Sequence, residues 1–365
     1  MYNELIEKSI SVTPGYFLFF PSEYELCIKN SYLSASLFKL KDKNKTSWIK
    51  EFFERLNYGQ VLKDIIHFVP NQYKKTVMNI IVTGLQKGYF TASLHDKHIL
   101  PYWMTNNMYG KEQFLKESIQ NTNMALIGLG VLGAKIASKL LRYEFNNLKL
   151  IDCGTLSNLH IENCHEYINQ RIGQNKVYAY EQFYKSKKDL CNTQFIDVQK
   201  FQSEKLEAEL KDCNFVTVAV DEYDPLLYSL INSLAIKYKF RWTLLFVDRW
   251  DLYIGPTFIP EQTGCLQCLE DIYVNKLDSL SPKLYKSVEE LKNGYPNIQF
   301  NPDHALIVSG FFLADLPNII GEMPRMIEPE NSLTLGKQLK IDTRNFDAKI
   351  LSTIKNPNCK CSKIE

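Results

Sequence analysis

The most constraining feature of the sequence is an apolar segment that runs directly into a glycine-rich turn. Residues 124–127 are apolar, Gly128, Gly130 and Gly133 follow with G-x-G-x-x-G spacing, and residues 134–141 have helical periodicity. A glycine turn between a strand and a helix leaves backbone N–H groups and the positive end of the helix dipole facing an anion, without Cβ atoms in the way. The segment predicts a nucleotide-binding turn, and a purely structural turn is the alternative.

Apolar segments with strand character recur after this turn and alternate with helical stretches. Residues 148–151 lead into Asp152, residues 214–220 lead into Asp221, and residues 242–247 form a further segment. Continuous apolar strands that alternate with helices are typical of a parallel sheet covered on both faces. For residues 124–365 we therefore predict an α/β fold with a doubly wound, mostly parallel, Rossmann-like sheet.

The first part of the chain has a different character. An aromatic run at residues 16–20, a helical stretch at 74–82 and a glycine-broken segment at 84–90 predict a winged-helix-like α+β domain over residues 1–92. Residues 93–123 are predicted to be a polar connector between the two domains.

Composition and charge exclude several classes of partner. Lys+Arg 43 against Asp+Glu 41 give the 365 residues a formal charge of +2, so no basic excess marks a nucleic-acid-binding face. No segment approaches the roughly 20 uninterrupted apolar residues that span a bilayer, and the first residues lack the order of a signal peptide. The 9 cysteines are an odd number, which disfavours a disulfide framework. We expect a cytoplasmic protein without nucleic-acid or membrane partners.

Further polar residues follow the predicted strands. Asp152 is placed to hydrogen-bond a ribose, and a loop-capping aspartate is its alternative interpretation. The segment from Arg171 to Lys176, which contains Gly173, is expected to open a helix beyond the second strand. Asp221 ends a later strand, where capping is again the alternative. An NAD-dependent oxidoreductase is compatible with the glycine turn and Asp152 alone.

The ordered set of these motifs, from about residue 124 onward, resembles the ThiF/MoeB superfamily, the ATP-using fold shared with ubiquitin-activating enzymes. The resemblance implies a role for each matching residue: nucleotide binding by Gly128, Gly130, Gly133 and Asn175, ribose binding by Asp152, phosphate contact by Lys176, and Mg²⁺ binding by Asp221. These roles suit the chemistry, because attack of a carboxylate on phosphorus requires positive charge on the phosphates.

The sequence departs from the family where the family usually carries Asn-Leu-x-Arg-Gln. An ungapped alignment places His160 and Asn163 at the asparagine and arginine positions, whereas alignment by identity places Ile161 at the arginine position. The phosphate-binding arginine is absent in both alignments. We name Arg171 as the catalytic candidate that takes its place.

Two further departures concern charge. Gly154 stands where the family frequently has a second acid. The arginine that family dimers lend to each other from before the glycine turn has no evident counterpart, and Lys97 and His98 are the nearest cations. Transfer of a phosphoryl group to the carboxylate therefore stays open beside transfer of AMP.

Two cysteine pairs complete the resemblance. Cys265-x-x-Cys268 and the distant Cys359-x-Cys361 resemble the tetracysteine zinc site of the family, although the second pair is one residue shorter than usual. Four thiolates would complete a structural zinc shell and hold the C-terminal tail to the body, with reduced thiols as the alternative. The stretch from Glu270 to Asn358 contains no cysteine, which disfavours a thioester relay.

The N-terminal module is similar to the leader-binding domain of superfamily members that modify ribosomally made peptides, such as those of microcin C and pantocin A biosynthesis. This resemblance implies ATP, Mg²⁺ and structural Zn²⁺ as cofactors, a precursor peptide bound through its leader, and a homodimer. The implied reaction is activation of a carboxylate in peptide antibiotic biosynthesis. The missing arginine favours Glu side chains and intramolecular condensation.

Other functions stay open. They are C-terminal peptide adenylation of the microcin C type, sulfur-carrier adenylation, a non-catalytic leader-binding scaffold for a partner cyclodehydratase, and an NAD-dependent oxidoreductase. The intact Gly128, Asp152, Lys176 and Asp221 argue against a scaffold, whereas the missing arginine argues for one. A decorative or dimerising domain is the alternative for residues 1–92.

Overall fold

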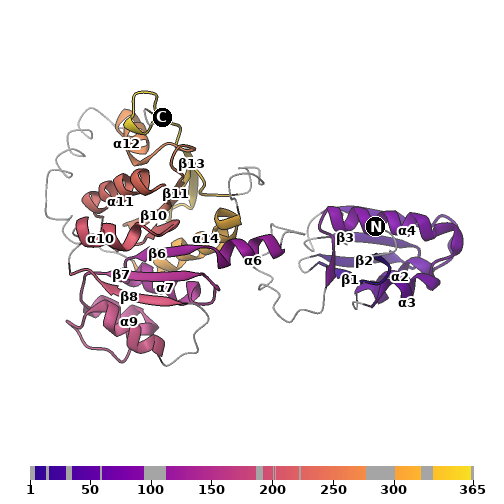
Figure 1. The fold of residues 1–365 in the computed structure, drawn as a ribbon. Coiled ribbons are helices and arrows are strands. Elements are labelled where there is room, and N and C mark those ends of the chain that lie inside the picture. The colour runs from indigo at the N-terminus through magenta and orange to yellow at the C-terminus, as the bar shows by residue number, and fades with distance from the viewer. Residues whose placement is uncertain are drawn as a thin grey trace. The chain divides into compact units, whose positions relative to one another are not determined.

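The computed structural model describes residues 5–13, 16–29, 35–57, 60–93, 112–185, 192–199, 201, 203–221, 223–276, 301–321 and 332–362. The chain divides into two compact units, Met1–Lys116 and Glu117–Glu365. The division falls inside helix α6 (Glu112–Gln120), so a part of the predicted connector is helical (Figure 1). The remainder of that connector, with Lys97 and His98, lies outside the described residues.

The N-terminal unit is a small α+β domain. Its strands are β1 (Ser9–Val12), β2 (Phe17–Ser22), β3 (Glu25–Lys29), β4 (Phe38–Lys41) and β5 (Phe90–Ser93). Its helices are α2 (Trp48–Asn57), α3 (Leu62–Ile65), the 3₁₀ turn η1 (Ile66–Phe68) and α4 (Asn71–Gln86). Strands β2, β3 and β4 form one antiparallel sheet, and β1 pairs with β5. Aromatic and aliphatic residues such as Phe52, Phe53 and Phe90 form its buried core.

The end of this unit differs in one respect from the sequence prediction. Helix α4 and the turn at Gly88, with φ +73°, are present as expected. The strand after the turn pairs with β1 at the start of the chain, rather than forming a local hairpin among the described residues. A pairing of this kind is chosen by long-range packing of Ile10 and Phe90 in one core, which sequence patterns do not report.

The second unit contains the predicted doubly wound sheet. In order of position, its strands in the described residues are β13 (Asp347–Ser352), β12 (Lys337–Asp342), β11 (Asp251–Phe258), β10 (Arg241–Asp248), β9 (Phe215–Val218), β6 (Asn123–Ile127), β7 (Asn147–Asp152) and β8 (Thr193–Asp197). Strands β10 to β8 in that order are parallel, and β11, β12 and β13 extend the sheet in antiparallel fashion. The predicted α/β fold is confirmed.

Helices cover both faces of this sheet. The helices of the unit are α7 (Val131–Leu140), α8 (Asn158–Asn163), α9 (Lys176–Lys185), α10 (Ser203–Leu210), α11 (Pro225–Tyr238), α12 (Leu266–Lys276) and α14 (Pro302–Gly321), with 3₁₀ turns η2 (His165–Tyr167) and η3 (Lys360–Ser362). Helices α10, α11 and α12 share one hydrophobic core with β6, β9 and β10. Helix α7 packs with α14, and Tyr180 of α9 hydrogen-bonds the Ala134 carbonyl of α7.

The strand order reverses beside the glycine turn. From β6 the chain adds β7 and β8 on one side, and it then returns to add β9 and β10 on the other side. Ligands of open α/β sheets bind at the carboxyl ends of the strands where the order reverses in this way. That point lies between β6 and β9, whose ends carry the glycine turn and Asp221.

Helix α14 is long and apolar enough to cross a bilayer by length and composition, but 67% of its most apolar window is buried inside the protein. Core helices of soluble proteins pass the same test. Its Asp315 is buried and accepts hydrogen bonds from the backbone N–H groups of Leu333 and Thr334. These contacts are those of a helix packed in the core against the chain that precedes β12.

Two helical glycines predict opposite responses to the same substitution. A Cβ atom at Gly133 would lie 1.9 Å from the Gly128 carbonyl oxygen, whereas nothing lies within 4 Å of one at Gly310. We expect Gly133→Ala to lower the free energy of unfolding by about 1–3 kcal/mol, because α7 must move off the turn. Gly310→Ala should raise it by about 0.5–1 kcal/mol. Urea denaturation measures both, and equal stabilisation by the two variants would contradict the close approach.

Candidate functional site

The glycine turn approaches β9 so closely that side chains are excluded. Gly128 has φ +106°, and a Cβ atom there would lie 2.4 Å from the Ala219 carbonyl oxygen. A Cβ atom at Gly130 would lie 2.1 Å from Oδ2 of Asp221. Gly128 is thus needed for backbone conformation, and Gly130 is needed so that an anion can reach the start of α7.

The carboxylate of Asp221 lies at the N-terminus of α7. Its Oδ2 accepts from the Val131 amide at 2.7 Å and its Oδ1 from the Leu132 amide at 3.0 Å, while Nε2 of His160 is 3.5 Å from Oδ2. Burial raises the pKa of Asp221, but the hydrogen bonds and the charge of Lys176 outweigh burial and hold that pKa below its usual range. The anion-binding end of α7 therefore holds an ionised internal carboxylate.

Asp152 ties the glycine turn to the end of β7. Its Oδ2 accepts from the Leu129 amide and its Oδ1 from the Gly154 amide, both at 2.6 Å. Nζ of Lys176 lies 3.8 Å from Oδ1 of Asp152, and a Cβ atom at Gly154 would lie 3.1 Å from the same Nζ. The capping interpretation of Asp152 thus describes its contacts here, and two carboxylate oxygens still leave lone pairs for a ribose hydroxyl.

Two residues that the sequence did not assign to the site support it. Nδ1 of His160 accepts from the Ser157 amide at 3.0 Å, so the hydrogen of the neutral ring is on Nε2, which faces Asp221. The hydroxyl of Tyr167 is buried and donates to the Leu129 carbonyl at 2.6 Å. The alignment of His160 with a family asparagine was a signal for the first residue; the sequence contained none for Tyr167.

The segment from Arg171 to Lys176 leads into a helix as expected. A turn at residues 172–173 precedes this helix, α9, which begins at Lys176. Oδ1 of Asn175 accepts from the Val177 and Tyr178 amides at 2.9 and 3.2 Å, which caps α9. Arg171 is exposed, and among the described residues its hydrogen bonds are those of its backbone. The structure brings Lys176 to the two acids and leaves Arg171 outside the group.

Asn163, which the ungapped alignment places at the family arginine, makes only local contacts among the described residues. Nδ2 of Asn163 donates to the Leu159 carbonyl at 2.8 Å, and Nζ of Lys135 donates to the Asn163 carbonyl at 3.0 Å. Lys135 thus serves the C-terminal end of α8, where a cation is favourable. These contacts give neither residue a hydrogen bond to Asp221.

The charge balance of the site favours an anion that brings a cation with it over a free anion. Two carboxylates, that of the buried Asp152 and that of the partly exposed Asp221, are opposed by one neighbouring ammonium group, Lys176, in the described part of the chain. Oxygen ligands of this type are those that Mg²⁺ prefers in proteins. The residues present therefore fit a nucleotide that arrives with a divalent cation.

The four cysteines of the two sequence pairs come together although the pairs lie far apart in the chain, with separations of 94 residues for Cys265 and Cys359 and 93 for Cys268 and Cys361. Their sulfur atoms all lie within 4.8 Å of one another. Cys265 is 3.9 Å from Cys268 and 3.6 Å from Cys359, and Cys268 is 3.6 Å from Cys361. Four thiolates about 2.3 Å from a zinc ion at tetrahedral angles would be about 3.8 Å apart, so the group fits that ion. Burial raises the pKa of the Cys265 thiol.

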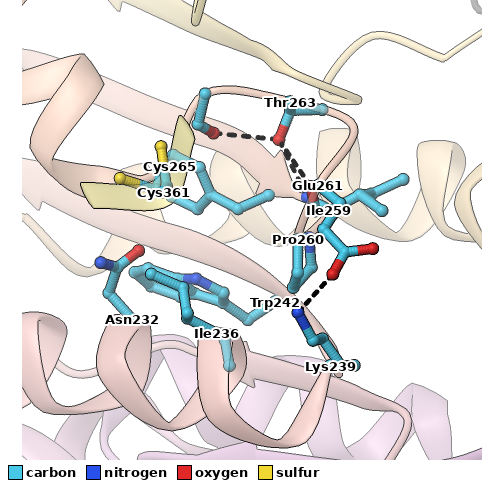
Figure 2. A pocket seen from close by; sticks show the side chains of 13 residues that line it. Asn232, Ile236, Lys239, Trp242, Ile259, Pro260, Glu261, Thr263, Cys265 and Cys361 are labelled. Atoms are coloured by element: carbon cyan, nitrogen blue, oxygen red, sulfur yellow. Dashed lines mark hydrogen bonds and ion pairs between the residues drawn. The ribbon is translucent and has the colours of Figure 1, made fainter. Parts of the chain in front are cut away.

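A small pocket lies beside the cysteine group, between α11 and the strands β10 and β11 (Figure 2). Trp242 and Phe258 line it, and Cys265 and Cys361 stand at its edge. It has room for about one water molecule. The pocket is therefore too small for a nucleotide, and none of the glycine-turn residues line it.

Comparisons with known proteins agree with this arrangement. The model of the ThiF family matches residues 104–362. No curated protein matches the chain by sequence. Among solved structures, E. coli MccB with ATP has a TM-score of 0.70 at 12% identity, over 97% of this chain and 99% of that one.

Two further solved structures have the same fold. The microcin C7 biosynthetic enzyme MccB in complex with N-formylated MccA has a TM-score of 0.69 at 12% identity, over 97% of this chain and 99% of that one. PaaA has a TM-score of 0.64 at 14% identity, over 94% of this chain and 99% of that one. At these identities the likeness establishes the fold, including a similar N-terminal unit.

The cysteine group predicts a metal content that one substitution removes. We expect the purified protein to contain about one zinc ion per chain and Cys268→Ser to contain almost none, because three thiolates close the shell poorly. Cys213→Ser is the matched control, since Cys213 is equally buried but lies outside the group. Atomic absorption measures both variants. Equal zinc content in the two would refute the assignment.

Proposed function

The chain belongs to the ThiF family, and from this premise we propose that it is an ATP- and Mg²⁺-dependent enzyme that activates a carboxylate of a ribosomally made precursor peptide. The observation that carries the proposal is the Asp221 carboxylate on the amide groups of α7, beside Asp152 and Lys176. A nucleoside triphosphate requires an anion site, acids and a lysine, and these groups lie together where the strand order reverses.

The residues of the site divide the work of activation. Gly128 and Gly130 let the phosphates approach the turn, Lys176 supplies a positive charge, and Asp152 accepts from the ribose. Asp221 would hold Mg²⁺. When bound there, the ion would supply positive charge for the phosphate oxygens. Positioning of a peptide carboxylate against the nucleotide then supplies much of the remaining acceleration.

The acceptor is proposed to be a Glu side chain, followed by intramolecular condensation in peptide antibiotic biosynthesis. The absence of the family arginine and the likeness to PaaA support this choice. The likeness to MccB supports C-terminal adenylation of the microcin C type as the second candidate. Release of AMP or of phosphate would distinguish adenylation from phosphorylation of the carboxylate.

The N-terminal unit is proposed to bind the leader of the precursor as an added strand. Strand β4 is an edge of its sheet in the described residues. The Asp42 amide donates to the Tyr24 carbonyl, and antiparallel pairing alternates, so the main-chain groups of Lys39 and Lys41 face away from β3. Such an edge can take a further strand, with main-chain hydrogen bonds providing affinity.

Three properties of the whole protein complete the proposal. The cysteine group would hold structural zinc, which has no open position for catalysis. A homodimer is supported by the exposed apolar side chains of Leu306 and Phe311 on α14, which are 54% and 38% exposed. We also propose a cytoplasmic location, without nucleic-acid or membrane partners.

Asp221→Ala tests the enzymatic proposal. We expect an about 100-fold or greater loss of ATP-dependent change in precursor mass, because the metal side of the nucleotide is lost. Leader binding should be unchanged. Asp212→Ala, which removes an exposed acid of the same unit, is the control. Mass spectrometry of a small precursor peptide encoded beside the gene measures the products, and full activity of Asp221→Ala would contradict the proposal.

Lys39→Pro tests the leader site separately. Proline removes the outward N–H group of Lys39 without removing a bond to β3, so leader affinity should fall about tenfold, as for one lost hydrogen bond. Lys39→Ala keeps the N–H group and should bind within about twofold of the unchanged protein. Fluorescence anisotropy of a labelled precursor measures both. Equal affinity of the two variants would place the leader elsewhere.

A further inference from the structure

We propose that His160 is a positioning residue of the nucleotide site. It keeps Asp221 in place when the phosphates of the nucleotide accept the hydrogen bonds of the α7 amide groups. The inference rests on the proposed function and deepens it. His160 stands where the ungapped alignment puts a family asparagine, and it is 8% exposed.

The orientation of the His160 ring is fixed by the contacts of its Nδ1 atom. Ser157 is the N-cap of α8, and its amide donates to Nδ1 of His160 at 3.0 Å, with the Ser157 hydroxyl at 2.8 Å from the same atom. A backbone N–H can only donate, so Nδ1 is an acceptor and Nε2 carries the hydrogen. The edge of the ring also meets Tyr167, with ring centroids 6.4 Å apart. Nε2 is therefore the ring nitrogen that carries the hydrogen, and it lies 3.5 Å from Oδ2 of Asp221.

The contact with Asp221 is long because other donors hold the carboxylate. The Val131 and Leu132 amides lie at 2.7 and 3.0 Å from its oxygens, whereas Nε2 of His160 lies at 3.5 Å. Both amides belong to the anion-binding start of α7, where phosphate would bind. A phosphate that uses them leaves Asp221 without its two shortest hydrogen bonds.

His160 supplies a replacement donor for Asp221. A buried carboxylate without partners is costly, and a charged hydrogen bond is stronger than a neutral one. The Nε2–H donor can shorten its contact with Asp221 once the amides are occupied, while Asp221 turns its other lone pairs to the Mg²⁺ that arrives with the phosphates. His160 thus acts through Asp221 and keeps the carboxylate beside the nucleotide.

A double-mutant cycle on nucleotide affinity tests the inference. The ligand is a non-hydrolysable ATP analogue with Mg²⁺, measured by calorimetry on the full chain. His160→Ala should weaken binding about tenfold. His160→Gln, whose amide can donate from a similar place, should stay within about threefold of the unchanged protein. His165→Ala, which removes an exposed histidine of the neighbouring turn η2, is the control and should leave affinity unchanged.

The decisive measurement uses the Asp221→Ala background. If His160 acts through Asp221, His160→Ala should change affinity there by less than about twofold, because residues that act together are not additive. A further tenfold loss in that background would show an independent or structural role and overturn the inference. A protein that binds no nucleotide in any form would overturn the proposed function as well, so the two failures are distinguishable.

Discussion

The amide groups at the start of α7, which have no acceptor within the helix, are the constraint on which the rest of the site depends. A helix packed at the end of β6 presents donors that must be satisfied, and here the Asp221 carboxylate satisfies the Val131 and Leu132 amides. The glycines follow from this geometry, because a side chain at Gly130 would occupy the place of that carboxylate. The amide groups that hold the Asp221 carboxylate are thus the groups that we propose for phosphate binding.

The charge balance follows from the same arrangement. Asp152 and Asp221 are both engaged with backbone amides, and Lys176 is the ammonium group beside them in the described residues. A polyphosphate alone would add negative charge to two carboxylates, whereas a polyphosphate with a divalent cation brings the compensating charge. The proposed need for Mg²⁺ is therefore a consequence of the protein's own acids. His160 contributes a directed donor without a net charge.

Features that depend on contiguous residues were predicted more closely than features that depend on contacts between distant segments. The strand, glycine turn and helix are contiguous, so local sequence predicted β6, the turn and α7 closely, and the acids that end β7 and β9 came with them. The pairing of β5 with β1 and the antiparallel β11, β12 and β13 depend on contacts between distant segments.

By itself, the sequence determined the α/β fold, the glycine turn between β6 and α7 and the two cysteine pairs, Cys265-x-x-Cys268 and Cys359-x-Cys361, because each is expressed in local spacing and residue type. Only the tertiary structure decided that Asp221 reaches α7, that His160 faces Asp221, and that Arg171 stays exposed. These outcomes depend on which loops the sheet brings together at the ends of β6 and β9. That proximity is a property of strand order, which local spacing does not encode.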